Sequence, residues 1–419
     1  MDKAKPYLIP KQLVMDAYQR VKANKGAAGI DDVTIQEFEK DLKNNLYKIW
    51  NRMSSGTYFP PAVKAVAIPK SNGGTRILGI PTVPDRVAQT VVKMVLEPIV
   101  EPKFHSDSYG YRPGKSALDA VGMARKRCWK YDWCIDYDIK GFFDNLDHCL
   151  VMKAVKHHTD SKWVLLYVER WLKAPLQKED GTLVQRDRGT PQGGVISPLL
   201  ANIFMHHTFD DWMRRNFPQI PFERYADDGL AHCSSYQQAQ LVLEAMKKRL
   251  QECGLEIHPD KTRIVYCKDE DRRKSHEHEK FDFLGFTFRP RLSKNKWGKQ
   301  FVNFTPAISN KAAQAIRDEI RSWQLHLRSD KRIDDIARMF NAQIRGWINY
   351  YGAFYKSALY PVLKTIEKDL ITWTRRKYKR LKGHQKRAEY WLGRIALREP
   401  NMFAHWRYVR SPVGKMGAG

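Results

Sequence analysis

Residues 222–233 read FERYADDGLAHC and set two adjacent carboxylates, Asp227 and Asp228, between apolar flanks. The flanks predict the two strands of a hairpin, and Asp-Gly is an ordinary turn signal, so the pair is on one interpretation a solvated turn. Two carboxylates held close together repel each other unless a cation lies between them. The same stretch is therefore also a candidate metal site, and the rest of the sequence has to decide between the two interpretations.

The composition describes a globular chain with a large excess of positive charge. Of 419 residues, 42% are hydrophobic and 12% aromatic, enough for about two to four domains. The net charge of +27 indicates a polyanionic partner, either nucleic acid or an anionic membrane surface. The sequence has no apolar run of about 18 residues, and its N-terminus, MDKAKPYLIPKQ, lacks the apolar centre of a signal peptide. We therefore expect a nucleic-acid partner, no membrane and a cytoplasmic location.

The positive charge is concentrated toward the C-terminus. Residues 291–419 contain 28 lysines and arginines against 9 acidic residues, a net charge of +19 that leaves +8 for the rest of the chain. We expect the polyanion to lie mainly along this C-terminal third.

The cysteines are scattered, without a C-x2-C pair or a regular framework, so reduced thiols are expected rather than a zinc site or disulfides. The tract HEHEK at 276–280 lies within the charged run KDEDRRKSHEHEK. It is interpreted as a solvated loop rather than a metal-binding tract.

Apolar spacing divides the chain into a helical start, an α/β middle and a helical end. Residues 11–50 show helical spacing broken by the turn NKGAAGIDD. From Val63 to about residue 290, short apolar runs split by Gly and Pro alternate with helical stretches, which is typical of an α/β core. Beyond residue 305, apolar residues recur at helical spacing with arginines largely off that face, which predicts a basic helical bundle.

Asp138 supplies a third carboxylate. The stretch DWCIDYDIKGFFDNLDH predicts a strand that ends at Asp138, then a turn, then a helix from about Asp147. Taken singly, Asp138 would be a strand-end residue. Three carboxylates from two neighbouring strands can instead hold two divalent ions about 3.5–4 Å apart, which activates a 3′-hydroxyl and stabilises a leaving pyrophosphate. That arrangement performs nucleotidyl transfer.

Seven motifs in order then carry a family resemblance. The chain resembles a reverse transcriptase, specifically the group II intron-encoded enzymes or intron maturases, over about residues 10–380. Any one of these motifs alone would be weak, but their common order is specific. They are IPKSNGGTRILGIP, SYGYRPGKSALDAV, DIKGFFDNLDH, RGTPQGGVISPLLANI, RYADD, PDKT and FLGF.

The resemblance implies an α/β (α+β) right-hand polymerase, with fingers, palm and a helical, basic thumb. The expected segments are an N-terminal helical extension, fingers and palm, a thumb or maturase domain, and a short C-terminal tail. Their bounds are 1–62, 63–290, 291–387 and 388–419. The last segment contains no cysteine, so no zinc-containing nuclease is expected.

The resemblance also assigns the catalytic and metal-binding residues. Asp138, Asp227 and Asp228 would be the ligands of two Mg²⁺ ions, with Mn²⁺ as a substitute, and the backbone carbonyl of Ile139 would assist. Lys70 and Arg76 fall where the fingers of such enzymes grasp the triphosphate. Without the surrounding motif, both would be interpreted as surface charges beside a turn.

Further residues of the nucleotide site follow from the same resemblance. Gln192 would lie over the sugar and base of the nucleotide, and Lys261 near the triphosphate. Phe143 would exclude a 2′-hydroxyl, although apolar burial is the commoner fate of phenylalanine, so at most one of Phe142 and Phe143 is the gate. Each of these residues has an ordinary structural explanation as well.

The tract FLGF matches the primer grip, with Leu284 and Gly285 at its centre, and would equally fit a buried strand. The expected partners are an RNA template with a DNA or RNA primer, dNTPs and a group II intron RNA, with target DNA as a further partner.

Three functions remain open from the sequence. The first is an RNA-directed DNA polymerase that also binds its parent intron as a splicing maturase. The second is the same polymerase serving defence or repair without an intron partner. The third is an RNA-binding maturase with a dead polymerase, and the complete set of Asp138, Asp227, Asp228, Lys70 and Arg76 argues against it.

Overall fold

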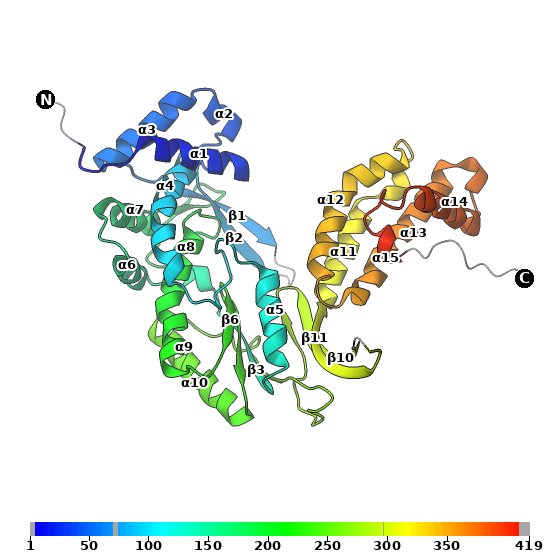
Figure 1. Cartoon of the computed structure of the whole chain (residues 1–419). Helices are drawn as coiled ribbons and strands as arrows, with labels where there is room; N and C mark the ends of the chain where they lie inside the picture. The colour runs from blue at the N-terminus through cyan, green and yellow to red at the C-terminus, as the bar shows by residue number, and fades with distance from the viewer. Residues whose placement is uncertain (1–4, 70–73, 296, 410–419) are drawn as a thin grey trace, which may run out of the picture. The chain divides into compact units, whose positions relative to one another are not determined.

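The computed structural model of the chain describes residues 5–69, 74–295 and 297–409. These residues form two compact units (Figure 1). Unit 1 comprises residues 1–116 and 135–263, and unit 2 comprises residues 117–134 and 264–419. The short segment 117–134 therefore joins the C-terminal part of the chain rather than its neighbours in sequence.

Unit 1 is built around a buried helix, α4 (Val83–Val100). This helix is apolar on most sides, which suits a helix that is packed all round. Thr82 caps it by accepting a hydrogen bond from the backbone N–H of Asp85 at 3.3 Å. Helix α1 (Lys11–Asn24) packs against α4 through the apolar spacing noted in the sequence.

A four-stranded sheet contains the two strands that the sequence predicts around its glycine-rich turn. Its order is β2-β1-β4-β5, and β1 (Val63–Pro69) runs antiparallel to β2 (Thr75–Ile80) with Ile68 opposite Arg76. Strand β4 (Leu176–Gln177) is parallel to β1 and pairs with β5 (Leu183–Val184). Lys70 lies outside the described residues.

The second sheet contains the stretch with two adjacent aspartates. Its order is β6-β7-β3-β8. The strands are β6 (Phe222–Tyr225), β7 (Asp228–Cys233), β3 (Trp133–Asp138) and β8 (Arg263–Tyr266). Both the predicted hairpin and the predicted strand that ends at Asp138 are confirmed.

The other helices of unit 1 pack around these sheets. Helix α8 continues into a π-helical turn over His206–Asp210, and α10 contacts β7. The helices are α2 (Ile35–Glu39), α3 (Leu42–Ser55), α6 (His148–Lys156), α7 (Lys162–Lys173), α8 (Ser197–Met205), α9 (Asp211–Asn216) and α10 (Tyr236–Glu252).

Unit 2 combines a three-stranded sheet with a helical bundle. The sheet order is β11-β10-β9, and its strands are β9 (Phe281–Phe283), β10 (Phe286–Lys294) and β11 (Gln300–Ile308). The helices are α5 (Ala117–Cys128), α11 (Asn310–Ser322), α12 (Ile333–Tyr351), α13 (Tyr360–Lys377), α14 (Gln385–Arg398) and α15 (Trp406–Val409).

The segment expected as a tail after residue 387 is folded as far as the structure describes it. Residue 387 lies inside α14, and Leu392, Ile395, Phe403 and Trp406 belong to the hydrophobic core of the helical bundle. Because these side chains are buried with the residues of α11 to α13, residues 388–409 are part of the bundle.

Among the described residues, no helix combines the length and apolar character needed to cross a membrane.

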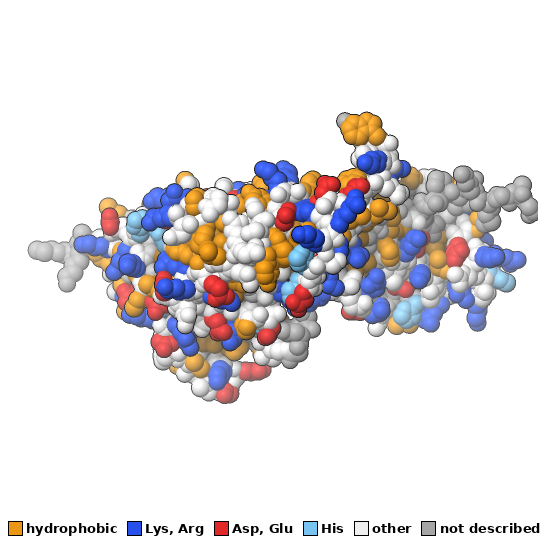
Figure 2. Space-filling view, turned by 90° about the horizontal axis from the view of Figure 1, so that it is seen from below, with side chains coloured by type: hydrophobic (Ala, Val, Ile, Leu, Met, Phe, Trp, Pro, Cys, Tyr) orange, Lys and Arg blue, Asp and Glu red, His pale blue; other side chains and the backbone are white. Residues whose placement is uncertain are grey.

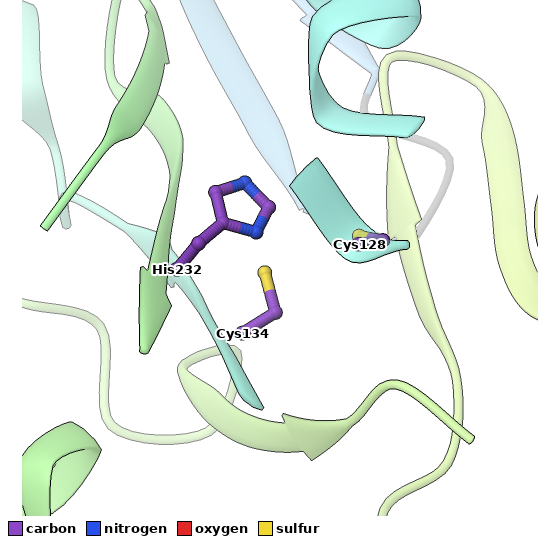
Figure 3. A group of neighbouring side chains, drawn as sticks. All are labelled: Cys128, Cys134 and His232. Atoms are coloured by element: carbon purple, nitrogen blue, oxygen red, sulfur yellow. The ribbon is translucent and has the colours of Figure 1, made fainter. Parts of the chain in front are cut away.

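Figure 3 shows two buried cysteines of unit 2, Cys128 at the end of α5 and Cys134 on β3, and also labels His232 of β7 in unit 1. Within unit 1, the Nε2 atom of His232 lies 2.7 Å from the Oε2 atom of Glu223.

Candidate active site

The two adjacent aspartates lie at the turn of the β6–β7 hairpin. Tyr225 pairs with Asp228, so Ala226 and Asp227 form a two-residue turn. Ala226 has a φ of +58°, in the left-handed region, which costs a residue with a Cβ about 1–2 kcal/mol. The fold must therefore hold this turn in place.

Asp138 reaches the same edge of the sheet because β7 and β3 are neighbours and β3 ends at this residue. The end of β3 is anchored on its other side, where the backbone N–H of His258 donates to the Asp138 carbonyl at 2.7 Å. Ile139 follows directly and forms an isolated bridge with Ile257. The structure thus brings together Asp138, Ile139, Asp227 and Asp228.

Burial and neighbouring charge perturb the protonation of Asp227 and Asp228. Loss of hydration raises the pKa of Asp228 to about 7, and the charges of Asp227 and Asp138 add to that effect. The pKa of Asp227 is also raised, first by burial and then by the charge of Asp138. Like charges gathered in this way favour a bound cation, because only a cation lets all of them stay ionised.

Lys261 contributes a positive charge to the edge of the carboxylate group. Its ammonium group forms an ion pair with the Asp138 carboxylate, and this hydrogen bond is the main reason why the pKa of Lys261 is raised. The lysine side chain is more than half exposed. Lys261 therefore stays protonated and can contact a ligand at the edge of the carboxylate group.

The donor set fits hard divalent cations. Carboxylate oxygens, with a backbone carbonyl beside them, are the ligands that Mg²⁺ and Mn²⁺ prefer. Asp138, Asp227 and Asp228 would hold such ions.

A buried arginine, Arg224, supports the strained turn and was not predicted from the sequence. The Arg224 side chain is fully buried and forms an ion pair with Asp210 through two bonds of 2.7 Å. It also donates to the Ala226 carbonyl at 3.2 Å, directly at the turn, and to Asn202 and Ser108. Arg224 thus ties the β6–β7 hairpin to α8, to the π-helical turn and to the loop before Tyr109.

Two more side chains lie near the carboxylates: Arg76 of β2, and Tyr111, which was not predicted from the sequence. Burial raises the pKa of Tyr111, the charges of Asp227 and Asp228 raise it further, and Arg76 opposes the shift. Tyr111 therefore lies within electrostatic range of both the aspartates and Arg76. Its ring centroid is 6.3 Å from that of Phe143 and 6.3 Å from that of Tyr225.

The two phenylalanines after Asp138 have different surroundings. Phe142 is buried in the core at 2% exposure, whereas Phe143 is only partly buried and meets Tyr111 edge to face. The backbone carbonyl of Phe143 accepts a hydrogen bond from the N–H of Thr190 at 2.8 Å. Phe143 is thus tied to the loop that carries Gln192.

The Gln192 loop is held against β2 by its backbone. The N–H of Gly79 donates to the Gln192 carbonyl at 2.7 Å. Gly193 has a φ of +113°, and a Cβ atom there would meet the Gly79 carbonyl at 2.6 Å. A residue larger than glycine is therefore excluded at this position.

A buried hydrogen-bond chain fixes the other side of that loop. The Gln89 side chain accepts from the backbone N–H groups of Val195 (2.8 Å) and Ile196 (3.2 Å), and donates to Asp85 at 2.9 Å. Asp85 accepts further bonds from Tyr58 and Trp171, and its burial raises its pKa to about 6. Helix α4 therefore positions the loop through Gln89.

The predicted primer grip lies in unit 2. Leu284 (φ +49°) and Gly285 (φ +79°) form a two-residue turn between paired Phe283 and Phe286, the geometry of a type I′ hairpin. The Tyr350 hydroxyl donates to the Leu284 carbonyl at 2.9 Å. This turn is therefore presented by β9 and β10 and is fixed by α12.

The comparisons with known proteins agree with these motifs. Residues 68–288 match the family described as reverse transcriptase (RNA-dependent DNA polymerase). Residues 313–391 match the group II intron, maturase-specific domain. The second match favours an intron-encoded enzyme over one that serves defence or repair.

Named relatives point the same way. The chain is 27% identical to the group II intron-encoded protein LtrA of Lactococcus lactis subsp. cremoris, over 83% of this chain and 69% of the relative. It is 32% identical to protein YkfC of Escherichia coli (strain K12), over 59% of this chain and 75% of the relative. It is 31% identical to the putative COX1/OXI3 intron 1 protein of Saccharomyces cerevisiae, over 48% of this chain and 24% of the relative.

The reverse-transcriptase match covers more than half of the sequence, and the maturase-specific match follows it in the order that such enzymes have. The chain belongs to the group II intron-encoded reverse transcriptases.

Proposed function

We propose that this reverse transcriptase uses Asp138, Asp227 and Asp228, with the Ile139 carbonyl, as ligands of two Mg²⁺ ions, for which Mn²⁺ can substitute. The observation that carries the proposal is the convergence of three carboxylates at one sheet edge, where burial and neighbouring charge raise the pKa values of Asp227 and Asp228. When bound, such ions activate the primer 3′-hydroxyl and stabilise the charge of the leaving pyrophosphate.

The residues around the carboxylates are proposed to bind and select the nucleotide. Arg76 and Lys70 hold the triphosphate, Arg76 as a two-pronged donor and Lys70 as a point charge. Lys261, kept protonated by Asp138, can give a proton to the pyrophosphate. Gln192 contacts the sugar and base, and the partly buried ring of Phe143 blocks a 2′-hydroxyl.

The nucleic-acid partners are proposed from unit 2 and from the family. The turn at Leu284 and Gly285 contacts the primer backbone, and the basic helices contact RNA. The enzyme is proposed to bind its intron RNA as a splicing maturase in the cytoplasm, with target DNA as a further substrate. The match to the maturase-specific domain supports this proposal.

A primer-extension assay tests the polymerase proposal. The purified full chain should extend a labelled DNA primer on an RNA template with dNTPs and Mg²⁺, and a chelator should stop the reaction. The absence of extension under any divalent metal would contradict the proposal. For the maturase role, the chain should accelerate the splicing of its intron transcript at low Mg²⁺, and an unchanged splicing rate would contradict that role.

A further inference from the structure

The β10–β11 hairpin ends in a tip that is both aromatic and basic. In Figure 1 these strands form a bent two-stranded ribbon, and in Figure 2 its end is a narrow projection with hydrophobic and basic side chains. Trp297 at the tip is 79% exposed, and Lys294 and Lys299 flank it and are also exposed. A large apolar side chain that is exposed beside other exposed apolar residues is typical of an interaction site.

The apolar face of this ribbon continues beyond the core. Near the base, Phe288 and Phe304 are buried on one face. Further along the ribbon on that face, Leu292 and Val302 lie opposite each other and are 56% and 37% exposed. Exposed apolar side chains therefore occur both at this pair and at Trp297.

The charge of the hairpin selects the kind of partner. Residues 284–308 contain five lysines and arginines and no acidic residue. Glu270 borders the edge of β11, where its backbone N–H donates to the Val302 carbonyl at 3.1 Å, so one acid lies beside the apolar pair. The tip itself is surrounded in sequence by cationic side chains, which favours a polyanion.

The turn that presents Trp297 is internally bonded. The Asn295 side chain accepts from the backbone N–H groups of Trp297 (3.0 Å) and Lys299 (2.9 Å). Gly298 takes a φ of +88°, which a residue with a Cβ rarely adopts. The Asn295 side chain thus holds the backbone N–H groups of Trp297 and Lys299.

We propose that this tip is a binding site for single-stranded RNA, in which Trp297 stacks on an unpaired base and Lys294 and Lys299 contact the adjacent phosphates. A tryptophan between cations is suited to this ligand, because every unpaired base offers a flat face and every linkage a negative charge. A duplex has no free base face, so it should not use the tryptophan. The proposal rests on the RNA partner proposed above.

The first test compares variants of the full chain by fluorescence anisotropy. The probe is a fluorescein-labelled oligoadenosine, and a blunt RNA duplex of the same length is the comparison. Trp297→Ala should weaken binding to the single strand about 5- to 150-fold, the effect of losing one stacked base. Trp297→Phe should retain most of the affinity, and Trp297→Leu should not. Leu327→Ala, at another exposed apolar side chain of unit 2, is the matched control and should have no effect.

A second test locates the contact. Oligoribonucleotides that contain 5-iodouridine should photocrosslink to the peptide that carries Trp297. Lys294→Gln and Lys299→Gln should each reduce the slope of log affinity against log salt by about 0.7, the value for one phosphate contact on a single strand.

The outcomes separate this site from the polymerase. Trp297→Ala should extend a short primer at the parental kcat, so failure of all extension in the parent would refute the proposed function rather than the tip site. An unchanged single-strand affinity, together with crosslinks that map only elsewhere, would overturn the tip site. Binding of the tip to anionic phospholipid vesicles, with no effect on RNA, would overturn it as well and identify a membrane surface instead.

Discussion

Removal of the Arg224 guanidinium should destabilise unit 1 far more than the removal of any surface charge. Five hydrogen bonds leave this group, two of them to Asp210, and neither side chain of the pair is exposed to solvent. In Arg224→Met, Asp210 is left as a buried charge without its partner, which costs about 3–5 kcal/mol. For a unit of this size, each kcal/mol lowers the Tm by about 2–4 °C, so a decrease of about 6–20 °C is expected.

The assay is thermal unfolding of four proteins in a double-mutant cycle. Asp210→Asn should cost a similar amount, because it leaves Arg224 unpaired. The double variant should be more stable than the sum of the single effects predicts, by at least about 2 kcal/mol. Arg214→Met is the matched control, since its ion pair with Asp211 lies at the surface and should contribute less than about 1 kcal/mol.

Two results would refute this reasoning. Additive effects of Arg224→Met and Asp210→Asn would show that the two side chains do not act as a pair. A loss no larger than that of Arg214→Met would show that Arg224 does not carry the stability of the hairpin. Because Arg224 also bonds the Ala226 carbonyl, primer extension should fall with the stability.

Three further predictions concern the nucleotide and metal sites. Phe143→Ala should permit ribonucleotide incorporation, whereas Phe142→Ala should mainly destabilise the fold by about 3–5 kcal/mol; a parental dNTP-to-rNTP ratio in Phe143→Ala would place the gate elsewhere. Gln89→Leu removes the acceptor of two backbone N–H groups, so it should raise the KM for dNTPs by about tenfold or more while changing kcat less; an unchanged KM would show that the loop does not depend on it. The Asp228 carboxyl has a pKa of about 7 and must lose its proton to bind a cation. The apparent Mg²⁺ affinity should therefore rise as the pH increases toward 8 and fall by up to about tenfold per pH unit below 7. A Mg²⁺ titration with no pH dependence would contradict the assignment of Asp228 as a metal ligand.

The parts of the site that the sequence predicted share one property: each is a local pattern. The hairpin around Asp227 and the strand that ends at Asp138 follow from alternating apolar residues and turn signals. Their meeting at one sheet edge came from the family motifs, because strand order depends on contacts distant in sequence. The assignments of Arg76, Gln192, Lys261, Leu284 and the other ligand contacts stay predictions.

The supporting residues could not be predicted in the same way. Arg224 lies in the tract FERY, where a charged residue is ordinarily exposed. Its burial depends on Asp210, Asn202 and Ser108, which come from three other segments of the chain. A pair of charged residues, Glu223 and Arg224, inside a short strand next to two aspartates is the signal that could have indicated a buried network.

The C-terminal segment after residue 387 is predicted from the sequence as a short tail, because the basic helical pattern ends near that residue. In the structure, Leu392, Phe403 and Trp406 fill the core of the bundle, and Glu367 accepts hydrogen bonds from His405 and Trp406. Burial against α13 thus orders a segment that is too short to fold alone.

The central claim, that the three carboxylates form the catalytic metal site, is tested most directly by the rate of single-nucleotide addition in Asp227→Asn. Asp147→Asn is the matched control, because the Asp147 side chain caps α6 and asparagine caps equally well. Asp227→Asn should lower the rate by several orders of magnitude while RNA affinity and Tm stay near the parental values, and Asp147→Asn should extend primers normally. Extension by Asp227→Asn at a tenth of the parental rate or faster would show that the three carboxylates are not the catalytic metal site.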